Sequence, residues 1–140
     1  MRKVIEYLIN KVLNRTFQFD NSVPLSYIFF LVFCKGWSLV RGLLKLKKFI
    51  YIGGNVKIRA KNKFTSGRSV SINDNVVIDA LSLDGVSIGN NSKINSYSFL
   101  IASGSLQDIG KGISIGSNVA IGEFSYVGGA GGVKIGDDTI

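Results

Sequence analysis

Residues 115–140 read IGSNVA IGEFSY VGGAGGVK IGDDTI. An aliphatic residue recurs in this stretch at intervals of six, usually followed by Gly, and a small residue stands four places after it. Self-similarity at a fixed short period is the sequence signature of a repeat architecture. The stretch therefore predicts a protein built from stacked short repeats.

The same six-residue frame recurs upstream. Its first position is Ile throughout, at Ile52, Ile58, Ile72, Ile78, Ile88, Ile94, Ile115, Ile121 and Ile135. Its fifth position is occupied by Val56, Asn62, Val76, Ser82, Ser92, Ser98, Val119, Ser125 and Thr139. All of these except Asn62 are Val, Ser or Thr. Small side chains are expected where the walls of a narrow interior converge, whereas unrelated strands would scatter long and charged residues there.

Two further regularities accompany the frame. The fourth position of alternate units is Asn or Asp, at Asn55, Asn75, Asn91, Asn118 and Asp138. These residue types tolerate the left-handed backbone region and suit tight corners. Many units are also entered by an apolar-x-Ile step, as in Val70/Ile72, Val86/Ile88, Ile113/Ile115 and Val133/Ile135. Such a step points two side chains to one face of a strand.

Together the patterns predict a mainly β solenoid in which three short parallel strands make one triangular coil. One coil cannot bury its own inner face, so stability must come from stacking. We expect strands from about residue 51 to the end of the chain. The side chains expected in the core are Ile72, Ile78, Ile88, Ile94, Ile115 and Ile121. An antiparallel sandwich with Gly-rich turns is the alternative, but sandwiches do not keep a period of six.

Charge divides the chain into two unequal parts. Its 140 residues carry a net charge of +8, with no His and one Cys. Residues 1–68 hold 14 basic and 2 acidic side chains, whereas residues 69–140 hold 3 basic and 7 acidic ones. The basic part is expected to face an anionic partner. A single Cys excludes an internal disulfide framework and fits a reducing compartment.

The basic part begins with helical patterns, which divide the chain into a leader (1–50) and a repeat domain (51–140). Residues 2–18 fit an amphipathic helix. After a break around Pro24, an apolar run extends over residues 25–34, is interrupted by Lys35 and Gly36, and resumes over residues 37–46. The first run has about ten residues, short of the roughly 20 that a membrane-spanning helix needs.

The leader is therefore expected to lie on the inner face of the cytoplasmic membrane without crossing it. The alternative is that its helices cap the open end of the solenoid, and one helix can serve each role. A cleaved signal peptide is disfavoured because the apolar run starts late and no small-x-small site follows it. Nucleic acid is not expected as a partner, because the basic residues alternate with long aliphatic runs rather than with stacking aromatics.

Residues 99–111 break the repeat frame. An insertion in a solenoid must loop out, and loops on one face often carry the binding function. A surface loop without a role is the alternative. The frame resumes at Ile113 and continues to residue 140.

The iterated motif, with Ile or Val first, often Gly second and a small residue fifth, resembles the hexapeptide-repeat acyltransferases over residues 52–140. The segments from Ser103 to Leu106 and from Gly128 to Gly132, behind a basic apolar leader, resemble one branch in particular. That branch is the sugar O-acetyltransferases of bacterial surface-polysaccharide gene clusters. The resemblance implies a left-handed parallel β-helix, acetyl-CoA as donor, a sugar or oligosaccharide hydroxyl as acceptor, and active sites between the subunits of a homotrimer.

In such enzymes a His takes the proton of the sugar hydroxyl as it attacks the thioester. This chain has no His. The sequence therefore assigns no catalytic residue, no metal ligand and no specific acetyl-CoA-binding or substrate-binding residue. We expect the chain to be an N-terminal fragment whose repeat is incomplete at its C-terminal end, and inactive alone. A non-catalytic membrane-associated scaffold is the alternative function. Zinc chemistry of the carbonic anhydrase type is excluded because it needs His ligands.

Overall fold

The computed structural model describes residues 2–13, 18, 20 and 22–140. The chain forms two compact units, Met1–Gly36 and Trp37–Ile140. The boundary between them falls within the second helix rather than at residue 50, where the sequence pattern changes.

The first unit is helical. Helix α1 comprises Arg2–Leu13, and the expected continuation of this helix through residues 14–17 lies outside the described residues. Helix α2 comprises Leu25–Leu46 and passes through Lys35 and Gly36 without a break. Its 22 residues make it the one helix in the described chain that is long and apolar enough to cross a membrane, judged by length and composition alone. The ten-residue run from which we argued against a span is thus part of a longer helix.

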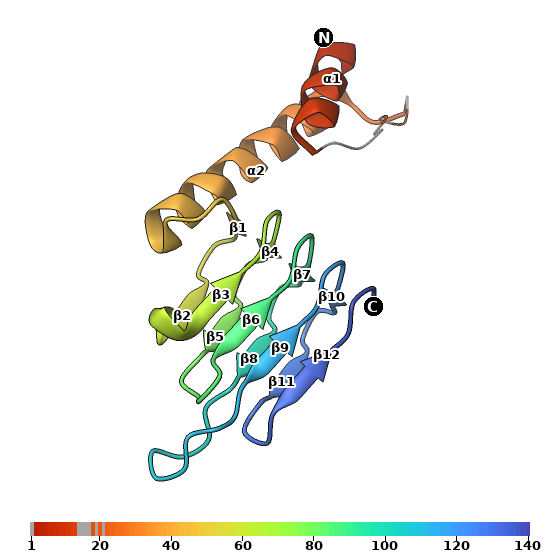
Figure 1. Ribbon diagram of the computed structural model, residues 1–140. Helices are drawn as coiled ribbons and strands as arrows, with labels where there is room; N and C mark the ends of the chain where they lie inside the picture. The colour runs from red at the N-terminus through yellow and green to blue at the C-terminus, as the bar shows by residue number, and fades with distance from the viewer. Residues whose placement is uncertain (1, 14–17, 19, 21) are drawn as a thin grey trace. The chain divides into compact units, whose positions relative to one another are not determined.

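The second unit contains three parallel sheets of four strands each (Figure 1). Sheet A has β1 (Tyr51–Ile52), β4 (Ser71–Ile72), β7 (Lys93–Ile94) and β10 (Ala120–Ile121). Sheet B has β2 (Lys57–Arg59), β5 (Val77–Asp79), β8 (Phe99–Ile101) and β11 (Tyr126–Gly128). Sheet C has β3 (Phe64–Ser66), β6 (Val86–Ile88), β9 (Ile113–Ile115) and β12 (Val133–Ile135). A short 3-10 helix, η1 (Lys61–Lys63), precedes β3.

Consecutive strands lie in different sheets, and every third strand returns to the same sheet. We call three consecutive strands, one in each of sheets A, B and C, a round. Tyr51 pairs with Ser71, Ser71 with Lys93, and Lys93 with Ala120. Successive rounds therefore begin 20, 22 and 27 residues apart, and each round repeats the pairing of the one before. The prediction of parallel strands in repeated sets of three behind a helical segment is confirmed.

The core lies between the three sheets. Five of the six side chains expected there are at most 3% exposed, namely Ile72, Ile78, Ile88, Ile94 and Ile115. The expectation for Ile121 is wrong, because this side chain is only partly buried. Ile121 is on β10, the edge strand of sheet A, so only one neighbouring strand covers it. The fifth-position residues Ser92 and Ser98 are buried, and each hydroxyl donates 2.8 Å to a turn carbonyl of the next round.

The corner residues take the expected backbone conformation. Asn55, Asn75, Asn91, Asn118 and Asp138 all have φ between 51° and 59°. Their side chains also bond from one round to the next, as in Asn118 Nδ2 to Asp138 Oδ1 at 2.9 Å. The sequence did not predict that Tyr97 and Phe124 adopt the same conformation, with φ of 61° and 54°. Bulky residues rarely occupy this region.

The last turns of α2 belong to the second unit and contact its first round. Leu46 packs against the core, and the Lys45 Nζ donates to the Val56 carbonyl at 2.9 Å. Gly42 is buried against the Ile50 carbonyl, so closely that a Cβ would not fit. This part of the helix therefore covers the inner residues of the first round. These contacts favour the capping alternative for residues 37–46, and both capping and membrane association stay predictions.

Candidate functional site

The three corners of a round differ in length. Four residues link sheet A to sheet B each time, as in 53–56 and 73–76, and four residues link sheet C to sheet A. The connection from sheet B to sheet C varies instead, over residues 60–63, 80–85, 102–112 and 129–132. We call these four segments the variable corner. All of the irregularity of the repeat is gathered there, and Figure 1 shows the longer connections after β5 and β8 projecting on the same side.

The variable corner returns to sheet C through glycine. Gly85, Gly112 and Gly132 directly precede β6, β9 and β12 and have positive φ of 76°, 143° and 90°. A Cβ on Gly112 would lie 2.6 Å from the Gly85 carbonyl oxygen. Non-glycine residues are disfavoured by both the backbone region and this contact. The glycines therefore bring loops of different length back to the same register.

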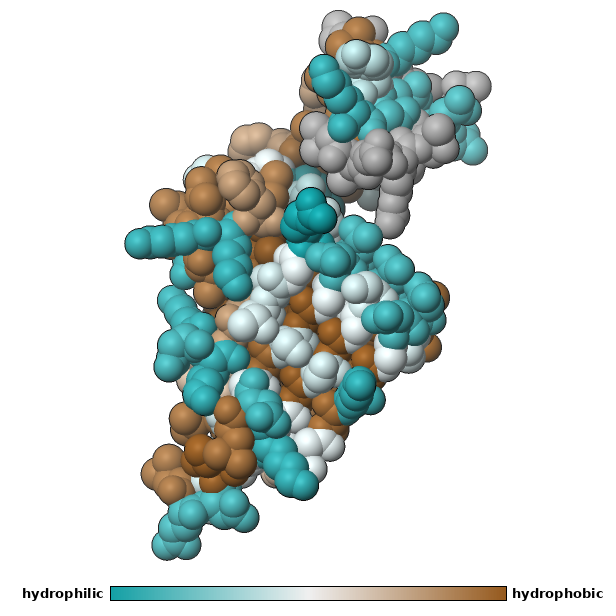
Figure 2. Space-filling view, viewed as in Figure 1, coloured by the Kyte–Doolittle hydropathy of each residue, from teal (hydrophilic) through white to brown (hydrophobic). Residues whose placement is uncertain are grey.

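An open pocket of ≈ 290 Å³ lies where the variable corner meets sheet C. Its polar lining comes from Asp84, Ser87, Lys111, Ser114 and Lys134. Ser87, Ser114 and Lys134 are paired neighbours on β6, β9 and β12. In Figure 2 the outward face of sheet C is covered mainly by weakly polar and apolar side chains, with hydrophilic ones along its margins.

The backbone around this pocket is held by hydrogen bonds between rounds. Asp84 N–H donates to the Lys111 carbonyl at 2.8 Å, and Lys111 N–H donates to the Ala130 carbonyl at 3.0 Å. The Lys63 ammonium donates to the Leu83 carbonyl at 2.9 Å, which fixes the loop before β6. The lining of the pocket thus combines two lysines, one aspartate and two serines with apolar residues such as Ile113 and Val133. Such a set can hold a polar ligand that carries negative charge.

The prediction that residues 99–111 leave the repeat is right only for their later part, because Phe99–Ile101 form strand β8, which pairs in register with β5 and β11. The chain leaves the repeat after Ala102, and Gly110 rejoins it through a parallel bridge to Ser82. Leu106 is 91% exposed at the loop. The sequence assigned no binding residue, and it missed Lys111 and Lys134. Their signal was their position: each is a basic residue beside the Gly and the apolar-x-Ile step that begin a sheet C strand.

A second surface feature lies at the corners that enter sheet B in the last two rounds, and on the first residues of β8 and β11. Tyr97 and Phe124 stack with ring centroids 5.0 Å apart and planes 5° apart. Two residues further on, Phe99 pairs with Tyr126 in sheet B. All four side chains are exposed. We call these four residues the aromatic column.

Comparisons with protein-family models, with curated proteins and with solved structures give no match to this chain.

Proposed function

We propose that the chain is part of a hexapeptide-repeat acyltransferase that O-acetylates a sugar or surface-polysaccharide precursor, with acetyl-CoA as donor. The observation that carries the proposal is the iterated six-residue motif together with the three parallel sheets through which it passes. In this proposal the three sheets form a left-handed parallel β-helix, a hexapeptide-repeat solenoid. The parallel pairing of every third strand supports the solenoid, while its left hand comes from the resemblance.

The donor is proposed to bind at the pocket beside the variable corner. Acetyl-CoA carries phosphates, and ammonium groups are suitable partners for them. Lys111 and Lys134 lie in adjacent rounds and are both exposed. The hydroxyls of Ser87 and Ser114 supply hydrogen bonds beside them. An exposed, preformed polar surface lowers the entropy cost of binding.

We propose that this chain lacks the general base that takes the proton of the acceptor sugar's hydroxyl. It contains no His. General-base catalysis requires a side chain of suitable pKa within hydrogen-bond reach of the reacting hydroxyl. We therefore expect residues 1–140 alone to bind acetyl-CoA without transferring its acetyl group.

We further propose a homotrimer at the inner face of the cytoplasmic membrane. The trimer comes from the resemblance, and the exposed aromatic column supports a subunit contact, because aromatic residues are enriched in such interfaces. The membrane location is supported by the exposed apolar side chains of α2, among them Phe29, Phe30 and Phe33. The lysines at the C-terminal end of this helix, Lys45, Lys47 and Lys48, suit the anionic cytoplasmic leaflet.

A non-catalytic membrane-associated scaffold is the second candidate. The observation that favours it is the lack of His in a chain that presents an exposed apolar helix. A scaffold does not need a donor site, so acetyl-CoA binding separates the two candidates.

Calorimetric titration of the full chain in mild detergent with acetyl-CoA tests the proposal. We expect saturable binding that weakens about tenfold in the variant Lys111→Ala/Lys134→Ala, which loses two charged donors. Lys57→Ala/Lys61→Ala, which also removes two lysines but lies outside the pocket, is the matched control and should bind as the parent does. Absence of binding would reject the donor site and favour the scaffold. Turnover of acetyl-CoA with a saccharide acceptor would show that the chain has its own base.

A further inference from the structure

The end of the second unit that contains residues 37–68 combines a strong positive charge with exposed apolar side chains. We call residues 37–68, which include the helix segment 37–46 and strands β1, β2 and β3, the basic end. From residue 37 to residue 73 the sequence contains nine basic side chains and no acidic one. The remaining part of the unit carries more acidic than basic residues, including Asp137 and Asp138 after β12. The charge is therefore unevenly distributed along the stack of rounds.

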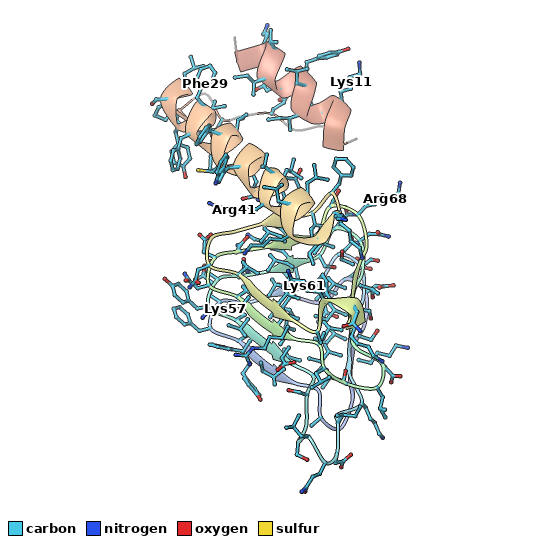
Figure 3. The ribbon with its side chains drawn as sticks, turned by 90° about the vertical axis from the view of Figure 1, so that its left-hand side faces the viewer. Lys11, Phe29, Arg41, Lys57, Lys61 and Arg68 are labelled. Carbon is cyan, nitrogen blue, oxygen red and sulfur yellow. The ribbon has the colours of Figure 1, made fainter. Side chains whose placement is uncertain are left out.

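Most of this positive charge is directed to solvent. Lys57, Lys61 and Arg68 are exposed. In the part of the chain that the structure describes, the ion pair formed by this group of side chains is Arg59 with Asp79 at 3.6 Å. Figure 3 shows Arg41 and Lys57 on one side of the basic end and Arg68 on the other, with Lys61 between them in this view. The labelled cations thus lie on different sides of the basic end rather than in one cluster.

The helix segment 37–46 is apolar on the side that faces away from the core. Trp37 is 53% exposed and Leu44 is 78% exposed, while Leu46 on the other side packs against the core. Phe49, just after the helix, is 79% exposed. Trp, Phe and Leu beside Lys and Arg are the side chains that enter the headgroup region of a bilayer.

We propose that the basic end is a lipid-binding surface that seats on an anionic bilayer and sets the orientation of the three sheets. The apolar side chains would enter the interface, and the surrounding Lys and Arg would contact lipid phosphates. Anionic headgroups attract such juxtamembrane cations within about a Debye length of the surface. The acidic later rounds would be repelled by the same surface, so the opposite orientation is disfavoured.

This orientation has a consequence for the pocket. Sheet C runs from β3 at the basic end to β12, three strand steps away. Strands are about 4.8 Å apart. The bilayer contact would therefore hold β12, which contributes to the pocket, about 14 Å beyond the first round. The inference does not depend on the acyltransferase proposal, because it concerns residues outside the pocket and requires no reaction.

Vesicle flotation of matched charge variants provides the first test. Lys57→Gln/Lys61→Gln/Arg68→Gln and Lys93→Gln/Lys111→Gln/Lys134→Gln each remove three positive charges, so both lower the net charge from +8 to +5. On vesicles of phosphatidylcholine and phosphatidylglycerol in equal parts, the first variant should partition about 10- to 100-fold more weakly than the parent chain. The second should stay within about threefold of the parent, since its lysines lie on later rounds. Equal losses in both would overturn the proposal.

Lysine footprinting on the unaltered chain provides a second test that works even if α2 anchors every variant equally. Amine acylation is followed by mass spectrometry, with the chain in neutral detergent or bound to the same vesicles. Lys57 and Lys61 should be protected on anionic vesicles, and Lys93 and Lys134 should remain reactive. Full reactivity of Lys57 and Lys61 on the vesicles would overturn the proposal. Protection of these two by a single-stranded RNA but not by vesicles would reassign the basic end to nucleic acid and would also overturn it.

Discussion

Two kinds of corner in the same repeat behave differently. The corners that enter sheet B and sheet A always have four residues and place Asn, Asp, Ser or an aromatic residue at positive φ. The variable corner, between sheets B and C, has between four and eleven residues. The constant corners set where the next strand stacks, and their side chains bond between rounds. The variable corner needs only a suitable return to sheet C, so it can accept insertions and form a pocket.

The largest expected effect comes from placing charge in the core that the constant corners define. Ile88→Asp should lower the free energy of unfolding by about 4 kcal/mol or more, because an unpaired carboxylate would be buried. Leu106→Asp places the same residue on the loop of the variable corner, where the side chain is 91% exposed. It should change stability by less than about 0.5 kcal/mol. Thermal unfolding in detergent measures both, and equal effects would remove the distinction.

Glycines at the two kinds of corner should also differ. A Cβ on Gly89, which leads from sheet C to sheet A, would meet the backbone of Gly116 in the next round. Gly89→Ala should cost about 1–3 kcal/mol, because stacked backbones cannot separate without breaking strand pairs. Gly131, in the variable corner, has open space around the corresponding position. Gly131→Ala should be within about 0.5 kcal/mol of the parent. A tolerated Gly89→Ala would mean that the rounds are less tightly stacked than described.

The left-handed corner positions allow a finer comparison. Asn118 has φ of 57° and bonds to Asp138. Asn118→Val should lower stability by about 1–2 kcal/mol, since a β-branched residue is unfavourable there. Asn118→Gly keeps the backbone conformation and loses only the exposed hydrogen bonds, so its cost should be under about 1 kcal/mol. Urea unfolding of the two variants measures the difference. A Val variant as stable as the Gly variant would argue against the assigned conformation.

The smallest of the stability effects should come from a buried hydroxyl. Ser98 is fully buried and donates to the Gly122 carbonyl. Ser98→Ala should cost about 1 kcal/mol, because the carbonyl loses its partner. Ser103→Ala, on the variable corner, should be close to neutral. Thermal unfolding compares the two, and a neutral Ser98→Ala would mean that the carbonyl finds another donor.

Sequence periodicity predicted the constant part of the fold well and the variable part poorly. Ile72 and Asn75 could be placed because burial and a tight corner each require a particular residue type at a fixed position. The positive φ of Tyr97 and Phe124 could not be predicted, because nothing in an aromatic side chain favours this backbone conformation. In the structure the two rings stack on each other between neighbouring rounds. Strand pairing between successive rounds brings Lys111 and Lys134 to one pocket, although they are far apart in the sequence. Continuity of α2 through Gly36 was also missed, because a change in the apolar pattern does not by itself end a helix.

The central claim is that the constant corners hold the fold and the variable corner holds the binding site. Deleting residues 103–111, which include the pocket residue Lys111, and joining the ends with two glycines tests it most directly, with unfolding and acetyl-CoA titration measured on the same sample. Loop length alone has a small effect on stability, about 1 kcal/mol or less. We therefore predict a cooperative unfolding transition within a few degrees of that of the parent chain, together with at least about tenfold weaker acetyl-CoA binding. Loss of the folded state, or a folded variant that binds acetyl-CoA as the parent does, would contradict the account.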